Sequence, residues 1–204
     1  MPNFFTISKE STIEYVIEKS KFIAFSFKVE SEEQIKAKLS SLEEKFKDAT
    51  HICYAYDLMS CKQKCSDNGE PSGTAGKPIL DCIQKQGLKN ILVAVVRYFG
   101  GIKLGAGGLV RAYSHSASLV IENSKKRELK NCAKLKFNIQ INELNKLDKI
   151  LNKFSTISKD INFSQDILVE IIIENEYQKE FISVIENTFN RKLEILENIN
   201  LYYW

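Results

Sequence analysis

The chain has 204 residues with a formal net charge of +3, and 44% of its residues are hydrophobic. This balance predicts a soluble globular protein with a sizeable core and excludes an intrinsically disordered chain. The longest apolar runs, at residues 91–96 and 167–173, are too short to span a bilayer. No signal-peptide pattern is visible at the N-terminus, so we expect a cytoplasmic protein without a membrane partner.

The cysteine pattern favours reduced thiols. An odd number of cysteines at irregular spacing argues against the disulfide framework of a secreted domain. Cys61 and Cys65 are spaced more loosely than in a zinc knuckle, and only His51 and His115 are available to complete a metal site. We therefore expect no metal site and no cofactor.

The first 60 residues predict a hairpin, a helix and a strand. Strand-like runs at residues 11–17 and 21–29 form the expected hairpin, and residues 51–59 form the later strand. Ser31 and Gln34 make a capping-box signature, which predicts that the helix begins after Ser31. The buried stripe of this helix consists of apolar residues at helical spacing: Ile35, Leu39, Leu42 and Phe46.

The middle of the chain predicts a buried strand between two helices. Residues 90–99 form a continuous apolar run, which is typical of a central strand with both faces covered. The helix before it is indicated by residues at helical spacing: Ile79, Cys82, Ile83 and Gln86. It is expected to end at Gly87, a natural C-terminal cap. The helix after it is expected to turn five residues inward: Val110, Tyr113, Ala117, Val120 and Ile121.

A domain boundary is expected near Cys132, after a polar stretch, which gives two domains at residues 1–132 and 133–204. In the second domain, residues 135–141 alternate as a strand with one buried face. A helix, two strands joined at residues 164–166, a second helix and a final strand follow. The order βαββαβ predicts a ferredoxin-like sandwich and an α+β class overall. We expect an interaction or stabilising role for this domain.

The strongest signal is the distribution of glycine. All nine glycines lie between Gly69 and Gly108, and all but Gly87 fall in two clusters at residues 66–78 and 97–113. Since glycine costs backbone entropy, its concentration indicates unusual backbone angles or close backbone approach in this one region. We therefore expect the functional site here.

Each cluster precedes a predicted helix, so its backbone N–H groups point outward as they do in an anion-binding nest. Gly76 and Lys77 are expected to approach an anion closely. Arg97, Lys103 and Arg111 are expected to contact phosphate, while the glycine backbone cradles it.

Simpler interpretations remain open. The glycines also suit tight turns without a ligand, and Arg97 also suits an ion pair with Asp67 or Glu70. These two carboxylates are weak evidence for a divalent metal. His51 and Cys53 share one strand face, as a nucleophilic pair does, although packing or hydrogen bonding explains such a pair more simply.

The motifs at residues 49–58, 66–80 and 90–117, with KSKFIA at 19–24, resemble the IMPACT (YigZ-like) family. The resemblance implies a first domain like the second domain of a small-subunit ribosomal protein, an α/β sandwich. It implies a second domain like the last domain of the translocation elongation factor. Eukaryotic relatives restrain the starvation-activated kinase of translation initiation by competing for its activator protein. Asn68 stands where an acidic residue is common, which weakens a metal-binding interpretation of that loop.

The resemblance implies a non-enzymatic regulator or accessory factor of translation that binds RNA, the ribosome or a translation-associated protein. Alternatives are a protein-docking module, and a hydrolase or phosphotransferase of a phosphate- or carboxylate-bearing small molecule, with His51, Asp67 or Glu70 as weak acid–base candidates. The site residues carried over are Asp67, Gly69, Glu70, Gly73, Gly76, Lys77, Arg97, Gly100, Gly101, Lys103, Gly105 and Arg111.

Overall fold

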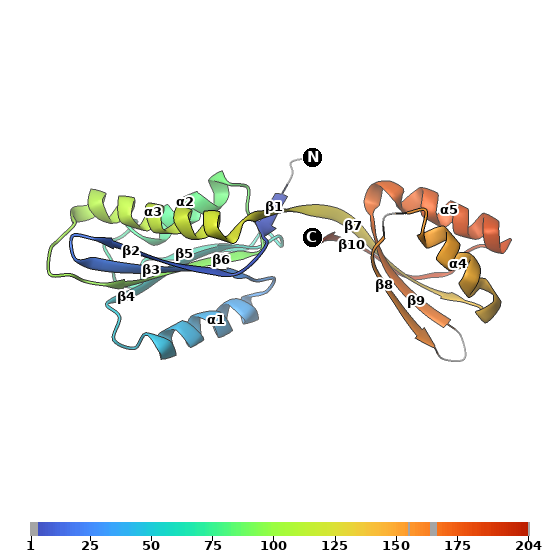
Figure 1. The fold of residues 1–204 in the computed structure, drawn as a ribbon, viewed down its shortest axis with the longest axis horizontal. Helices are drawn as coiled ribbons and strands as arrows, with labels where there is room; N and C mark the ends of the chain where they lie inside the picture. Colours follow the sequence, from blue (N-terminus) through green and yellow to red (C-terminus); the bar gives the residue numbers. More distant parts are fainter. Residues whose placement is uncertain (1–3, 155, 164–166, 204) are drawn as a thin grey trace. The chain divides into compact units, whose positions relative to one another are not determined.

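The computed structural model describes residues 4–154, 156–163 and 167–203, and the turn expected at 164–166 lies outside them. The chain divides into two compact units, Met1–Leu129 and Lys130–Trp204 (Figure 1). The division falls inside a strand, three residues before Cys132, the expected boundary. Within the described residues, none of the helices combines the length and apolarity that crossing a membrane requires.

The first unit contains a five-stranded sheet in which every neighbouring pair is antiparallel. The predicted hairpin and both later strands are confirmed, and the short edge strand β5 was not expected. In sheet order the strands are β2 (Ser11–Ile17), β3 (Ser20–Lys28), β6 (Ile91–Tyr98), β4 (His51–Asp57) and β5 (Gln63–Ser66).

Helices cover both faces of this sheet, with α1 (Glu32–Lys45) on one and α2 (Gly76–Lys85) and α3 (Gly105–Ser124) on the other (Figure 1). Alternate residues of β6 enter different cores: Val93 and Val95 pack toward α2 and α3, whereas Ala94 and Val96 pack toward α1. The continuous apolar run therefore reflects two covered faces of an antiparallel sheet.

The ends of the predicted helices follow their local signals. Ser31 is the N-cap of α1, and its Oγ accepts a hydrogen bond from the Gln34 N–H at 3.4 Å. The Gln34 side chain accepts in return from the N–H of Glu30, one residue before the cap (2.8 Å). Gly87 follows α2 with a φ of +65°, which glycine tolerates best.

The inward face of α3 is confirmed for four of its five predicted residues, because Tyr113, Ala117, Val120 and Ile121 are all buried. The prediction was wrong for Val110, which is 37% exposed. Leu109 is buried in its place, since it lies four residues before Tyr113 and continues the same stripe.

In the second unit, one face of a second sheet packs against two helices. The described elements are β7 (Lys126–Ile139), α4 (Leu144–Leu151), β8 (Thr156–Phe163), β9 (Ile167–Glu174), α5 (Gln178–Phe189) and β10 (Ile195–Tyr203). This is the predicted order of strands and helices, and the strands lie in the order β10, β7, β9, β8. The first residues of β7 pair with β1 (Phe4–Ile7), which the sequence pattern did not predict.

Candidate functional site

The first glycine cluster folds around the carboxylate of Asp67, just beyond β5. Asp67 Oδ1 accepts hydrogen bonds from the N–H groups of Ala75 (3.0 Å) and Gly76 (2.8 Å), and Oδ2 accepts from Gly73 (2.8 Å). The sequence analysis assigned these N–H groups to an external anion. That assignment needs correction, because the carboxylate of the protein itself occupies the N-terminus of α2. Lys77, which follows, pairs with Asp81 at 2.8 Å on the surface.

Burial acts to raise the pKa of Asp67, but the hydrogen bonds from Gly73, Gly76 and Ala75 outweigh it, so its pKa lies below the ordinary value. A lowered pKa stabilises the fold above the unfolded-state pKa, roughly 3.9, and this contribution is lost as pH falls through the folded-state value. We expect Asp67→Asn to reduce the free energy of unfolding at pH 5–7, with a deficit that shrinks below about pH 4. Urea unfolding of both proteins across this range measures it, and a constant deficit down to about pH 2 contradicts the assignment.

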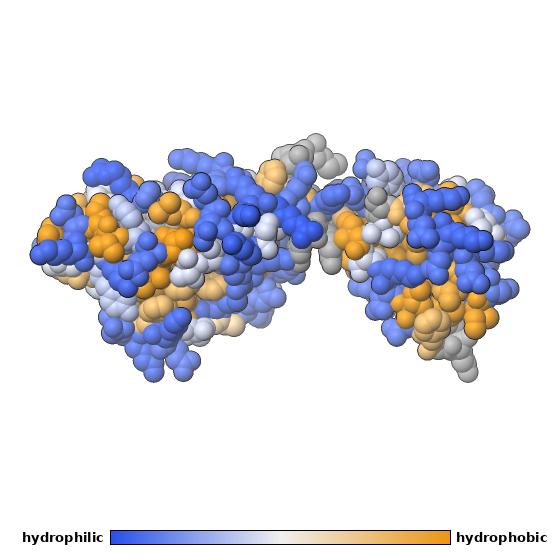
Figure 2. Space-filling view, viewed as in Figure 1, coloured by the Kyte–Doolittle hydropathy of each residue, from blue (hydrophilic) through white to orange (hydrophobic). Residues whose placement is uncertain are grey.

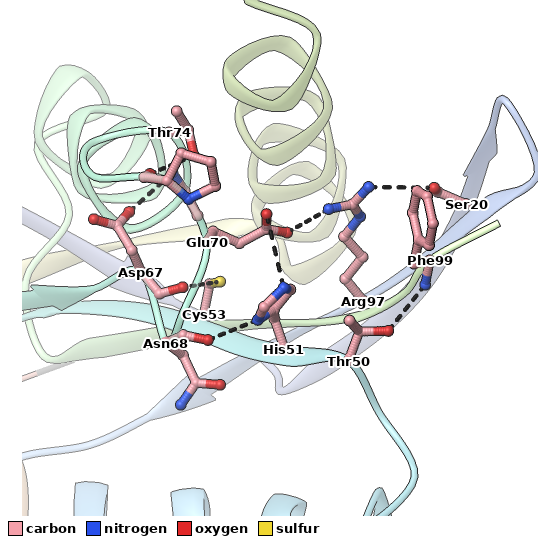
Figure 3. Close-up of polar contacts among 12 residues, drawn as sticks. Ser20, Thr50, His51, Cys53, Asp67, Asn68, Glu70, Thr74, Arg97 and Phe99 are labelled. Atoms are coloured by element: carbon pink, nitrogen blue, oxygen red, sulfur yellow. Dashed lines mark hydrogen bonds and ion pairs between the residues drawn. The ribbon is translucent and has the colours of Figure 1, made fainter. Parts of the chain in front are cut away.

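Glu70 and Arg97 form a buried ion pair, one of the alternatives that the sequence left open. Glu70 Oε1 accepts from Arg97 Nη1 at 2.6 Å and from the Tyr113 hydroxyl at 2.8 Å. The two charged side chains are only 3% and 6% exposed. The guanidinium also lies 5.5 Å from the ring centres of both Phe22 and Phe99. Arg97 is therefore buried. It is paired with Glu70 inside the first unit (Figure 3) and does not lie at an open surface, where its contact with phosphate was predicted.

The side chain of His51, on β4, contacts the same loop. Its Nδ1 lies 2.7 Å from the carbonyl oxygen of Asn68 and therefore donates to it, and its Nε2 lies 3.9 Å from Glu70 Oε2. Gly69 lies against this ring with a φ of +86°, and a Cβ there would come within 3.3 Å of it. Figure 3 shows Glu70 between His51 and Arg97.

Cys53 does not form a nucleophilic pair with His51. Its Sγ lies 2.9 Å from the carbonyl oxygen of Asp67 and 3.3 Å from the hydroxyl of Tyr113. Burial raises the pKa of the thiol to about 12, so it stays protonated at neutral pH. Cys53 is a buried packing residue, which is the simpler of the two interpretations.

The three acid–base candidates thus have their hydrogen bonds or charge partners inside the first unit. Asp67 caps α2, Glu70 neutralises Arg97, and His51 holds the Asn68 carbonyl. The sequence analysis did not assign Tyr113 to this cluster, although a tyrosine hydroxyl on a buried stripe usually needs a polar partner. What this arrangement does is fix the first glycine loop to the sheet.

The second glycine cluster contains glycines with different structural roles. Gly100 packs against the β2–β3 turn so closely that a Cβ would lie 2.0 Å from the carbonyl carbon of Lys19. Its N–H donates to Ser20 Oγ at 3.2 Å, so the loop is attached to this turn. Gly101 and Gly105 have φ values of +86° and +68°, and a Cβ on either would meet no atom within 4 Å. They provide backbone conformation at an open surface.

The N-terminus of α3 differs from that of α2, where the Asp67 carboxylate accepts from the N–H groups of Ala75 and Gly76. Leu104 is the N-cap residue, makes no capping bond, and no acidic residue lies in the first turn. Gly107 is exposed within this turn, and a Cβ there would meet only the flexible side chain of Arg111, at 3.5 Å. A glycine inside a helix costs about 1 kcal/mol relative to alanine. The packing of the first unit gives no reason for Gly107.

The exposed charged side chains of the segment around this helix start are cationic. Lys103 and Arg111 are exposed, and no carboxylate occurs in the chain between Asp81 and Glu122. We call the exposed residues Gly101, Lys103, Gly105, Gly107 and Arg111 the glycine-loop surface. Figure 2 shows hydrophobic residues in orange among the hydrophilic ones on the surface of the first unit. In the loop before α3, Phe99 is 46% exposed and Ile102 is 40% exposed.

Fold and surface together define a two-unit α/β protein that presents a glycine-rich, cation-bearing loop. Residues 18–121 match the model of the Impact N-terminal domain, and the chain belongs to the IMPACT family, as its motifs predicted.

Two relatives and one solved structure are similar to this chain. One relative and the solved structure match nearly all of it, and the other relative matches half of it. The chain is 34% identical over 197 residues to the IMPACT family member YvyE of Bacillus subtilis, covering 96% of this chain and 91% of that protein. It is 42% identical over 106 residues to YigZ of Escherichia coli, covering 50% of this chain and 52% of that protein. A crystal structure of a protein described as hypothetical is 26% identical, with a TM-score of 0.71 over 96% of this chain and 97% of that one.

Proposed function

We propose that this chain is a non-enzymatic, cytoplasmic accessory factor or regulator of translation that binds RNA, alone or in the ribosome, through the glycine-loop surface. The family resemblance supports the link to translation, because the eukaryotic relatives act on translation initiation. The internal bonding of His51, Asp67 and Glu70 supports a binding role over the alternative of acid–base catalysis.

The observation that carries this proposal is that neither packing nor backbone conformation requires a glycine at position 107. The other glycines near α3 have an internal reason: Gly100 touches backbone, Gly101 and Gly105 have positive φ, and a Cβ on Gly108 would lie 3.0 Å from the Cβ of Leu104. Gly107 has room and an ordinary conformation. A glycine retained at a cost in helix stability fits a site where a partner comes close to the backbone.

The charge of the surface favours a polyanion as that partner. Lys103 and Arg111 flank a helix N-terminus, where backbone N–H groups and the helix dipole attract phosphate. Lys85 and Lys89 also belong to the carboxylate-free segment, although Lys89 pairs with Asp57. Phosphate binding of this kind depends strongly on salt.

The folds of the two units support a resemblance to domains of the translation machinery. In the second unit, α4 and α5 pack on one face of the sheet. Numbered within that unit, the strands lie in the order 4-1-3-2, which supports a ferredoxin-like fold comparable to the last domain of the translocation elongation factor. In the first unit, the helix-covered sheet supports the ribosomal-protein-like sandwich implied by the family motifs.

We expect Gly107→Ala to raise the stability of the protein by up to about 1 kcal/mol while it weakens RNA binding. Urea unfolding measures stability, and fluorescence anisotropy with labelled RNA measures affinity.

Lys103→Gln is expected to weaken RNA binding and to reduce the slope of log affinity against log salt by roughly one unit or less. The matched control is Ser40→Ala on α1, which improves helix propensity on the opposite face of the sheet and should leave affinity unchanged.

Cosedimentation with ribosomes over the same salt series extends the test to the assembled particle. If wild-type protein binds neither RNA nor ribosomes at low salt, the proposal is wrong. If Gly107→Ala and Lys103→Gln reduce capture of a translation protein but leave RNA affinity intact, the partner is a protein.

A further inference from the structure

Phe99 is an exposed aromatic residue that the first unit holds in a fixed position. The residue is 46% exposed and directly follows the last residue of β6. Its backbone N–H donates to Thr50 Oγ1 at 3.0 Å, and the Arg97 guanidinium lies 5.5 Å from the centre of its ring. Arg97 is in turn fixed by Glu70 at 2.6 Å (Figure 3). The guanidinium of the buried ion pair therefore lies beside the ring of a residue that is about half exposed to solvent.

The chain that follows Phe99 leaves space beside this ring. Gly101 is open, since a Cβ there would meet nothing within 4 Å, whereas Gly100 is packed against the backbone of Lys19. Lys103 is exposed two residues further on, and the glycine-loop surface continues from there to Arg111. An aromatic ring, open backbone and cations without carboxylates occur together in one segment of the chain.

Building on the proposed function, we infer that Phe99 is a stacking platform for an unpaired base, so that the glycine-loop surface takes single-stranded RNA. Proteins that bind single strands combine a cationic path for the backbone with aromatic side chains that stack on bases. In an RNA duplex the base faces are stacked on one another and are not available to a protein ring.

The composition of the loop favours this ligand over a protein. A protein hot spot places its aromatic anchor inside a ring of contacts that excludes water. Around Phe99 the loop offers mainly glycine backbone and a lysine, with Ile102 as its exposed apolar side chain. Backbone and charge suit a phosphodiester chain, whereas they contribute little apolar area to a protein interface.

The test compares Phe99→Leu and Phe99→Trp in anisotropy titrations with single-stranded and duplex RNA of equal length. Stacking is worth about 1–3 kcal/mol per base, so we expect Phe99→Leu to weaken single-strand binding about 5- to 150-fold, and Phe99→Trp to retain it. The salt slope should not change, because neither substitution removes a charge. Duplex binding should be weaker in the wild type and unaffected by Phe99→Leu.

Ile102→Ala is the matched control, since it removes an exposed apolar side chain from the same loop without removing an aromatic ring. An equal loss with Ile102→Ala and Phe99→Leu indicates apolar docking and overturns the inference. Unchanged single-strand affinity in Phe99→Leu, with a clear loss in Lys103→Gln, also overturns it and leaves the proposed function standing. Absence of RNA binding by the wild type overturns both.

Discussion

Glu70→Gln is expected to lower the free energy of unfolding by about 3–5 kcal/mol, because it leaves the charge of Arg97 buried without a counterion. The side chains of Arg97 and Glu70 are 6% and 3% exposed, so water cannot replace the lost partner. Glutamine has nearly the volume of glutamate, and the change therefore tests charge rather than packing. The same oxygen of Glu70 also accepts from Tyr113, so two hydrogen bonds are weakened together.

Urea unfolding at neutral pH measures this loss. Asp81→Asn breaks the Lys77–Asp81 pair, whose side chains are 58% and 41% exposed, and should leave stability nearly unchanged. The double variant Glu70→Leu with Arg97→Met removes both buried charges and should recover most of the loss. Equal effects of Glu70→Gln and Asp81→Asn contradict the assignment of a buried ion pair.

Gly100→Ala is expected to destabilise the first unit by about 3 kcal/mol, at the upper end of the usual cost of overpacking. The added Cβ would lie 2.0 Å from the carbonyl carbon and 2.1 Å from the carbonyl oxygen of Lys19. These are backbone atoms, which no rotamer change can move away. The β2–β3 turn or the loop after β6 must shift, and the bond from Gly100 N–H to Ser20 Oγ is strained or lost.

Gly107→Ala is the matched comparison, because it adds the same methyl group seven residues along the chain, where the structure leaves room. Thermal or urea unfolding should show opposite signs, with Gly100→Ala less stable and Gly107→Ala more stable than the wild type. If both variants lose stability equally, Gly107 has a structural role and does not mark a binding site.

The sequence predicted most of the fold because local signals were strong. The capping signal at Ser31, the apolar run before Arg97 and the alternation before Ile141 each specify an element through the chemistry of neighbouring residues. The short strand β5 escaped prediction, since a four-residue edge strand has too few residues to show a period. Val110 was wrongly predicted to be buried. It lies next to the buried stripe of α3, and only its angle around the helix axis separates it from that stripe.

The sequence indicated the region of the candidate site, but the structure shows different contacts within it from those predicted. Nine glycines within forty residues marked the region correctly as one of unusual backbone. They did not reveal that the first cluster encloses Asp67, or that Glu70 rather than Asp67 pairs with Arg97. Whether a backbone N–H is free depends on which side chain reaches it, and that is decided by contacts between residues distant in the chain.

The sequence alone therefore determined the family, the order of the longer strands and helices, and the segment that carries the unusual backbone. Only the tertiary structure decided which charges are internal and which remain at the surface, because Arg97, Glu70 and Tyr113 come from separate elements that meet only in the folded unit. It also separated Gly100, which packing requires, from Gly107, which packing does not. Residue type is a local property, whereas burial and free space arise when the sheet and its helices pack together.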